Sequence, residues 1–327
     1  MLKKIAFILI LLLFLTPIIL FVWWGSVSSP VNKDSKETKI IVVPQGWGVE
    51  QIGLKLLSDG MIKNVLAFKL MVAKEGISTK LQAGDFRLSP SMNLYEITDS
   101  LTHGTLDIWL TIPEGLRREE QATLIADSFS KHDVDFDVLE YTEKTASIEG
   151  YLFPDTYLVP KNSKPDDVIK VLSDSFEKKY SQIEIETGLS QKQIIILASL
   201  VEREAKYDED RPLIAGILQK RLKSGWTLDV DATLQYALGS KNCSVGKPDC
   251  KWWPVVLGKD KEIVSPFNSY KTQGMPPAPI CNPGLESIKA AANPEDSPYW
   301  FYLADPSGKT HYAKTLEEHN ENISKYL

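Results

Sequence analysis

The sequence has few of the residues on which most metal and nucleophile motifs depend. Its 327 residues include only four histidines and three cysteines. The histidines lack the spacing of metal ligands, which favours structural or solvent-exposed roles: His103, His132, His311 and His319. No Gly-x-Ser-x-Gly nucleophile elbow and no His-Glu-x-x-His zinc motif is present. Gly308-Lys309-Thr310 resembles the end of a phosphate-binding loop, but Leu303 stands where that loop needs its first glycine. We therefore predict neither a metal site nor a cofactor.

An excess of positive charge is also missing. Asp and Glu number 43 against 37 Lys and Arg, which gives a net charge of −6 at pH 7. Proteins that bind nucleic acid broadly carry basic surfaces, so this balance argues against nucleic-acid partners. Hydrophobic residues make up 43% of the chain, which is ordinary for a globular protein, and the length allows two or three domains.

One long uncharged segment is present at the N-terminus. Two lysines precede residues 5–24, a run of about twenty uncharged residues that is long enough to cross a bilayer as a helix. Flanking lysines stay in the cytoplasm, so we predict a single-pass anchor in the cell membrane and an extracytoplasmic remainder. Trp23 and Trp24 fit the membrane interface. A cleavable signal peptide is the alternative, because Ser26-Val27-Ser28 resembles a cleavage site, and it would export the same domain.

The three cysteines allow more than one arrangement. In an exported protein, Cys243 and Cys250 could form a disulfide that closes a short loop. A zinc site is less well supported, because six intervening residues is an unusual ligand spacing and no histidine is close in sequence. Cys281 could instead pair with either of the other two, and the sequence leaves this open.

Composition and turn residues divide the chain into segments of an α+β protein. The Gly, Ser, Pro and Asn residues of the second segment are typical of a flexible tether. The last segment, rich in aromatic residues and proline, is predicted to be a mixed α/β domain whose loops carry the site. The predicted segments are residues 1–24 (anchor), 25–38 (tether), 39–105 (small α+β module), 106–147 (second small α+β segment) and 148–327 (site-bearing domain).

Hydrophobic periodicity predicts the elements within these segments. In the small module we predict strands over residues 39–43 and 84–88 and helices over residues 49–58, 65–74 and 94–101. A third strand begins at residue 108, and a helix follows over residues 117–129. Further helices are predicted over residues 191–207 and 212–224.

The helix predicted over residues 191–207 carries the best candidate for an acid catalyst. Ser190 and Gln193 form a capping box at its start. Glu204 continues the apolar stripe of this helix, whereas Glu202 lies on a neighbouring stripe of small residues. Burial disfavours a charged carboxylate, so its pKa should rise, which suits a group that protonates a glycosidic oxygen near neutral pH. The alternative is that Glu204 pairs with a nearby basic residue: Arg203, Arg211 or Lys220.

Three further clusters have side chains suited to sugars. The first combines aromatic rings with carboxylates, although it could equally be a packed turn: Glu149, Tyr151, Phe153, Asp155 and Tyr157. The second offers groups for sugar hydroxyls and N-acetyl groups: Asp229, Asp231, Thr233, Gln235 and Tyr236. In a strand, its two aspartates would lie on one face. The third comes from aromatic, proline-rich segments predicted to be ordered loops that line a groove: Asn268, Tyr270 and Asn282.

Together these segments resemble the MltG family of YceG-like endolytic transglycosylases, nearly end to end in order and spacing. The matching parts are residues 148–157, 197–204, 231–236, 265–270, 276–277 and 282–284, with His311, His319 and Asn320 in the tail. The resemblance implies a LysM-like module over residues 39–105 and a catalytic domain from about residue 148. It also implies that Glu204 is the catalytic acid, with Glu202 as second choice. Ala205 departs from several relatives, which have a small hydroxyl residue there.

The resemblance implies cleavage of MurNAc–GlcNAc bonds in nascent peptidoglycan strands, leaving 1,6-anhydroMurNAc ends and limiting glycan elongation. Glu204 would protonate the leaving oxygen and then take the proton of the muramic C6 hydroxyl. The implied partners are glycan strands and peptidoglycan synthases. A lysozyme-like hydrolase is one alternative, and it would need a second carboxylate such as Asp155 or Asp231. A non-catalytic scaffold that binds the cell wall is the other.

Overall fold

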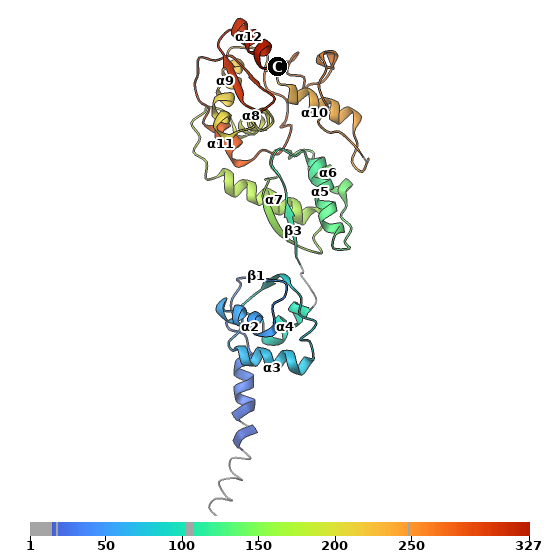
Figure 1. The fold of residues 1–327 in the computed structure, drawn as a ribbon, viewed down its shortest axis with the longest axis vertical. Helices are drawn as coiled ribbons and strands as arrows, with labels where there is room; N and C mark the ends of the chain where they lie inside the picture. Colours follow the sequence, from blue (N-terminus) through green and yellow to red (C-terminus); the bar gives the residue numbers. More distant parts are fainter. Residues whose placement is uncertain (1–14, 18, 103–106, 248) are drawn as a thin grey trace, which may run out of the picture. The chain divides into compact units, whose positions relative to one another are not determined.

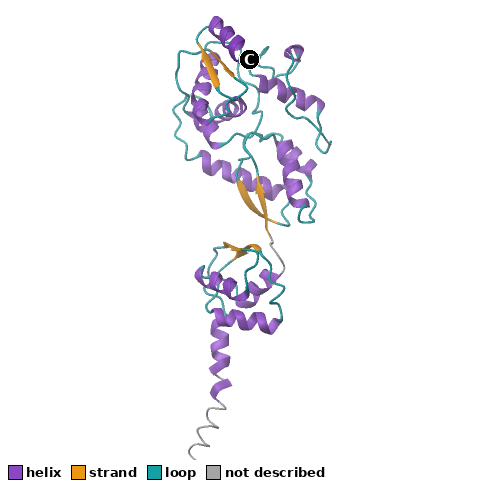
Figure 2. Ribbon diagram, in the orientation of Figure 1, coloured by secondary structure: helices purple, strands orange, loops and turns teal. Residues whose placement is uncertain are grey.

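The computed structural model describes residues 15–17, 19–102, 107–247 and 249–327 (Figure 1). The chain divides into two compact units: Met1–Ile108 with Pro160–Asn162, and Trp109–Val159 with Ser163–Leu327. In the described ranges, helices accompany three small sheets of two strands each (Figure 2). This mixture of helix and strand confirms the predicted α+β class.

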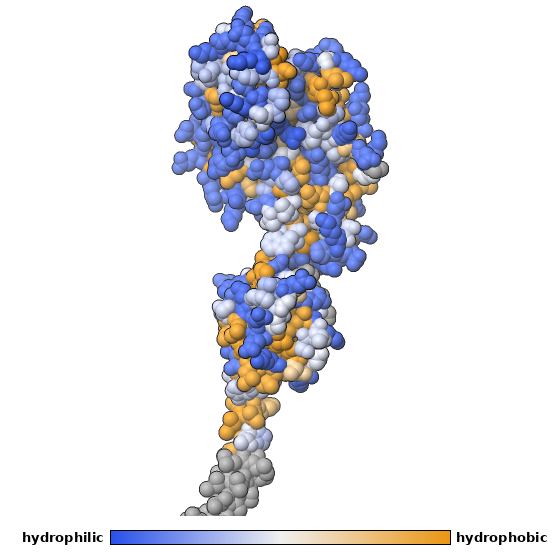
Figure 3. Space-filling view, in the orientation of Figure 1, coloured by the Kyte–Doolittle hydropathy of each residue, from blue (hydrophilic) through white to orange (hydrophobic). Residues whose placement is uncertain are grey.

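Much of the predicted membrane anchor lies outside the described residues, which start at residue 15 and omit residue 18. Residues 15–17 and 19–28 are helical. In the part of the chain that is described, no helix combines the length and the apolar composition needed to cross a bilayer. Trp23, Trp24 and Val27 pack against the core of the first unit. The remaining exposed side chains of this helix are mainly hydrophobic, as Figure 3 shows.

The segment predicted as a tether begins inside this helix and is hydrogen-bonded to the rest of the first unit. Lys63 donates hydrogen bonds to the Ser26 carbonyl (3.2 Å) and to the Ser29 hydroxyl (2.8 Å). The Asn32 amide donates to the Pro90 carbonyl at 2.9 Å. The contacts of residues 26–32 thus differ from those expected of a free linker.

The first unit is a strand–helix–helix–strand–helix module with its own core. Its strands are antiparallel, with Lys39 opposite Leu88 and Val43 opposite Gly84. Along the first strand, buried and exposed side chains alternate in its second half, which places one face on the core. Its elements lie where the sequence predicts them, to within one residue: β1 Lys39–Val43, α2 Val49–Ser58, α3 Val65–Glu75, β2 Gly84–Leu88 and α4 Leu94–Thr102.

The second unit contains the remaining elements, apart from Asp107 and Ile108 of β3 and Pro160 of β4. The strands β3 and β4 pair with each other, as do β5 and β6. The elements are β3 Asp107–Thr111, α5 Arg118–Ser130, α6 Val138–Lys144, β4 Thr156–Pro160, α7 Pro165–Tyr180, α8 Gln191–Glu204, α9 Arg211–Lys223, α10 Asp231–Asn242, α11 Leu285–Ala292, β5 Phe301–Ala304, β6 Thr310–Ala313 and α12 Leu316–Tyr326, with short 3₁₀ helices η1 Asp208–Asp210 and η2 Gly258–Glu262.

Helix α8 is the centre of the second unit. It packs against α9, α10 and α11, and every residue from Ile194 to Val201 is buried. The predicted capping box is present, because the Ser190 hydroxyl accepts from the Gln193 amide and the Gln193 side chain accepts from the Ser190 amide. The helix ends at Glu204, three residues before the predicted end at Tyr207. The first turn, residues 191–193, and the last turn, residues 202–204, are therefore the parts of α8 that leave the core.

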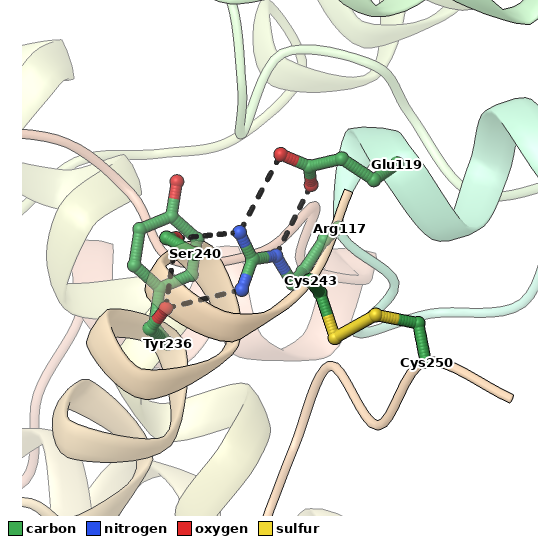
Figure 4. The surroundings of a disulfide bond; sticks show 6 residues. All are labelled: Arg117, Glu119, Tyr236, Ser240, Cys243 and Cys250. Atoms are coloured by element: carbon green, nitrogen blue, oxygen red, sulfur yellow. Dashed lines mark hydrogen bonds and ion pairs between the residues drawn. A yellow bond between two sulfur atoms is a disulfide. The ribbon is translucent and has the colours of Figure 1, made fainter. Parts of the chain in front are cut away.

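Helix α10 is held to the start of α5 by a buried arginine (Figure 4). Arg117 is fully buried and pairs with Glu119 at 3.1 Å. It donates to the Tyr236 carbonyl (3.1 Å) and the Ser240 hydroxyl (2.8 Å) of α10. The Trp252 ring lies 4.7 Å from its guanidinium carbon. The buried charge is thus surrounded by hydrogen-bond acceptors and aromatic faces.

A disulfide joins Cys243 and Cys250, whose Cα atoms are 5.6 Å apart, and Cys281 is buried as a free thiol. The loop that follows approaches α10 so closely that only glycine fits at residue 239. A Cβ atom at Gly239 would lie 2.2 Å from the Trp252 carbonyl oxygen. The disulfide therefore belongs to a loop that covers Arg117.

Candidate functional site

The last residue of α8, Glu204, lines a cavity of about 460 Å³ in the second unit. The walls come from segments that are far apart in the sequence. They carry acids, cations and aromatic rings together: Glu204, Asp229, Asp231, Arg221, Lys261, His319, Tyr270, Phe301 and Tyr302. Such a mixture of convergent polar groups and rings is typical of a ligand site.

The environment of Glu204 favours its protonated form. Burial is the largest influence, with a smaller contribution from the charge of Asp231, and together they raise the pKa of Glu204 to about 7. A hydrogen bond from the Tyr302 hydroxyl, the charge of Arg221 and the Ala232 backbone amide act in the opposite direction. Ala232 belongs to the first turn of α10, where helix amides are free to bind an anion. The structure therefore surrounds one acid with groups that can stabilise either protonation state.

The two aspartates of the second cluster do not lie in a strand as expected. Asp229 has a left-handed backbone, with φ 54°, and Asp231 is the first residue of α10. Both aspartates line the cavity, and Asp231 accepts a hydrogen bond of 2.7 Å from the Tyr270 hydroxyl. The turn at Asp229, rather than strand alternation, brings them to one site.

Two other predicted residues support the cavity from behind. Thr233 is buried, and its hydroxyl lies 2.9 Å from that of Ser269 in the loop that precedes Tyr270. Asn268 is also buried, donates to the Lys261 carbonyl at 2.9 Å and accepts from the Tyr270 amide at 3.0 Å. Their side chains hold the loops that carry Lys261 and Tyr270.

Arg221 connects three parts of the site. It is buried, and its guanidinium donates to the Trp300 carbonyl at 2.7 and 3.0 Å and to the Leu228 carbonyl. These bonds link α9 to the segment before β5 and to the turn before α10. Lys261 differs, because its ammonium group lies at the rim, 4.3 Å from the centre of the Tyr270 ring.

The first predicted cluster does not reach this cavity. Glu149 is buried and accepts from the Arg118 amide (2.8 Å), the Arg118 guanidinium (2.9 Å) and the Tyr236 hydroxyl (2.8 Å). Burial, with the charge of Glu119, raises the pKa of Glu149 to about 7. Both carboxylate oxygens of Glu149 accept hydrogen bonds from within the protein. Glu149, Arg118 and Tyr236 therefore form a structural network.

The other members of the first cluster pack in the core or reach solvent. The Tyr151 ring lies 5.0 Å from that of Phe176. Phe153 is buried, and its carbonyl accepts a 2.6 Å hydrogen bond from the Tyr157 hydroxyl. The Asp155 side chain is 46% exposed, 4.0 Å from Lys179. This arrangement is the packed turn that the sequence left as an alternative.

Asn282 and Gln235 also lie outside the cavity lining. Asn282 is fully buried, and its side-chain oxygen accepts from the amides of Gly150 (2.8 Å) and Leu152 (3.1 Å). It joins the segment before α11 to the first cluster. Gln235 is half-buried on α10.

Glu202 has a different environment from Glu204. Its carboxylate accepts from the Arg211 guanidinium at 2.9 Å and from the Gly284 amide at 3.0 Å. The Glu202 and Arg211 side chains are both nearly inaccessible. Arg211, considered above as a partner of Glu204, therefore pairs with Glu202, which does not line the cavity.

Several cavity residues were not identified from the sequence. Tyr302, Phe301 and Arg221 are the main ones, with His319 stacked on Phe301 at 5.2 Å. Burial and the charge of Arg221 lower the pKa of His319. The four consecutive aromatic residues 299–302 were the available signal. In the described ranges, no group of three or more His, Cys, Asp or Glu residues is arranged to hold a metal.

Known proteins match the sequence of this chain over most of its length. The profile of the YceG-like family matches residues 41–325. The endolytic murein transglycosylase of Bacillus subtilis (strain 168) is 33% identical over 335 residues, an alignment that covers 94% of this chain and 90% of that protein. The endolytic murein transglycosylase of Streptococcus pneumoniae serotype 2 is 28% identical, over 91% of this chain but 60% of that protein.

A solved structure of a YceG-like protein also matches this chain. The crystal structure of a YceG-like protein from Listeria monocytogenes has a TM-score of 0.52 and 28% identity, over 88% of this chain and 99% of that one. The family profile covers most of the chain, and the Bacillus protein aligns over nearly its full length. This chain therefore belongs to the YceG-like family.

Proposed function

We propose that the chain is an endolytic lytic transglycosylase that cleaves MurNAc–GlcNAc bonds in peptidoglycan strands, with Glu204 as its acid and base. The observation that carries this proposal is the position of Glu204 in a cavity that raises its pKa to about 7. An acid that is about half protonated near neutral pH can both give and retrieve a proton. The names of the Bacillus and Streptococcus relatives support the reaction class.

The residues around Glu204 have defined roles in this proposal. Glu204 protonates the glycosidic oxygen as positive charge develops at the muramic C1 atom. The carboxylate that results is stabilised by Tyr302, Arg221 and the Ala232 amide, whose interactions favour the ionised form. Glu204 then takes the proton of the C6 hydroxyl, whose oxygen bonds to C1 and gives the 1,6-anhydro end. One side chain therefore serves both half-reactions.

The proposal also covers the location of the protein and the role of its first module. We propose a single-pass membrane anchor over residues 5–24, an extracytoplasmic catalytic domain and a LysM-like, glycan-binding module over residues 39–105. The separate hydrophobic core of that module supports its folding as a unit of its own. A disulfide in the second unit supports an oxidising, extracytoplasmic location. Cleavage beside peptidoglycan synthases would limit the length of growing strands.

Product analysis tests the reaction. Purified protein incubated with peptidoglycan is expected to release anhydro-muropeptides, detected by mass spectrometry. A muramidase is the second candidate, because Asp229 and Asp231 line the same cavity as Glu204 and could activate a water molecule. Reducing-end products alone, lost in an Asp231→Asn variant, would establish the hydrolase instead. A scaffold without activity would release neither.

The pH profile of cleavage should report the pKa of Glu204. The acid must carry its proton for the first step, so the rate is expected to decline about tenfold per pH unit above about pH 7. Tyr302→Phe removes a hydrogen bond that lowers this pKa, so the decline should move to higher pH. Tyr312→Phe is the matched control, because the Tyr312 hydroxyl donates to Asp210 outside the cavity lining. A decline that stays in place in the Tyr302 variant would contradict this assignment.

A further inference from the structure

A pair of tryptophans, one exposed and one half-buried, adjoins the cavity. Trp226 follows α9 and is 44% exposed. Its ring centre lies 4.5 Å from that of Trp300 and 6.1 Å from that of Phe301. Phe301 itself lines the cavity of Glu204. The aromatic surface is thus continuous from the solvent-exposed indole to the catalytic site.

Contacts within the protein hold the pair in place. The Trp226 amide donates to the Arg221 carbonyl at 2.9 Å, directly after Gly225, whose left-handed backbone (φ 71°) ends α9. The Lys220 ammonium lies 4.4 Å from the centre of the Trp300 ring. Arg221 binds the Trp300 carbonyl through two hydrogen bonds. Because these side chains are already ordered, little conformational entropy is lost when a ligand stacks on them.

The position of the pair suits a polymeric ligand. An extended chain advances about 3.3–3.6 Å per residue, so the Cα atoms of Trp226 and Asp229 are at most about 11 Å apart. Asp229 lines the cavity, whose volume is about 460 Å³. That volume accommodates a ligand of modest size, whereas a strand cut internally continues beyond it on both sides. A sugar outside the cavity needs a separate contact surface.

We propose that Trp226, supported by Trp300, is a sugar-stacking subsite that binds an N-acetylhexosamine of the glycan strand next to the cavity. This inference rests on the proposed function. The C–H faces of pyranose rings are apolar, and an exposed indole offers a flat apolar surface to them. An exposed indole such as that of Trp226, stacked on a second ring at the rim of a site, is typical of a binding surface rather than a core. The subsite makes affinity depend on the length of the strand.

Glycan oligomers of increasing length test the subsite. The Glu204→Gln protein, which is expected to bind without cleaving, is titrated with a peptidoglycan disaccharide and with longer oligomers by calorimetry. Affinity is expected to rise with length, and Trp226→Ala on this background should reduce the affinity for long oligomers about fivefold to tenfold. Its affinity for the disaccharide should be unchanged. Trp226→Phe keeps an aromatic face and should retain most of the gain with length.

The controls separate this inference from the proposed function. Trp109→Ala removes a tryptophan that is 46% exposed on β3 and does not line the cavity, so it should bind every oligomer as the parent does. Thermal unfolding of the Trp226 variants checks that they fold. Equal binding of long oligomers by the parent, Trp226→Ala and Trp226→Phe would overturn the subsite, even if the wild type releases anhydro products. Absence of both cleavage and glycan binding would overturn the proposed function itself.

Discussion

Replacement of Glu204 by glutamine is expected to abolish strand cleavage and leave the fold intact. Glutamine has nearly the same shape but cannot donate a proton to the leaving oxygen or accept one from the C6 hydroxyl. General acid–base catalysis contributes about 10²–10⁴-fold, and here one group serves both steps, so the loss should be near the upper end. Release of soluble muropeptides from purified peptidoglycan measures the rate. Thermal unfolding should shift little, because the side chain is half-buried at the end of α8.

Glu202→Gln is the matched control for this experiment. It alters an acid two residues away, on the same helix, which pairs with Arg211 and lies outside the cavity lining. We expect it to lose stability, because the buried Arg211 charge is left with a weaker partner. Its cleavage rate at a temperature where it is folded should stay within about tenfold of wild type. Full activity in Glu204→Gln together with inactivity in a folded Glu202→Gln would reverse the assignment.

Replacement of Arg117 by alanine is expected to cause the largest loss of stability. The guanidinium is fully buried, pairs with Glu119 and binds two acceptors on α10. Breaking a buried pair typically costs about 3–5 kcal/mol, and the missing side chain also leaves a cavity under the Trp252 loop. For a domain of this size that corresponds to a decrease in Tm of about 10 °C. Calorimetry of the wild-type and variant proteins measures it.

A second arginine, Arg203 on α8, contacts the same loop through Trp253 and provides the comparison for Arg117. The guanidinium carbon of Arg203 lies 3.9 Å from the centre of the Trp253 ring, but the residue is exposed. Arg203→Ala should therefore cost no more than about 1 kcal/mol. Similar decreases in Tm for Arg117→Ala and Arg203→Ala would show that the buried network does not carry the stability assigned to it.

The sequence was most informative about α8, the helix that carries Glu204. Capping residues and apolar periodicity predicted α8, and they predicted that Glu204 would be withdrawn from solvent. Both depend on local spacing, which a single sequence contains. The strands and helices of the first unit could be predicted for the same reason, since each has a clear period and a turn residue at its end.

The role of the three clusters predicted to bind sugars was harder to predict, because an aromatic ring or an amide that binds sugar is the same residue type as one that packs in a core. Asn282 and Glu149 are polar, yet their acceptors are used by the backbone of Gly150 and by Arg118. Tyr302 was overlooked although it contacts Glu204, because nearly one hundred residues separate them and no local period connects them. Only the tertiary fold distinguishes these cases.

The wall of the Glu204 cavity is assembled from segments that end with α12, the last helix of the chain. A polypeptide that has been synthesised only as far as α11 contains the acid but lacks Phe301 and Tyr302. The Glu204 cavity is therefore complete only once the β5–β6 hairpin and α12, which packs on both of these strands, are in place. A chain that lacks these C-terminal elements keeps Glu204 but loses much of the wall that surrounds it.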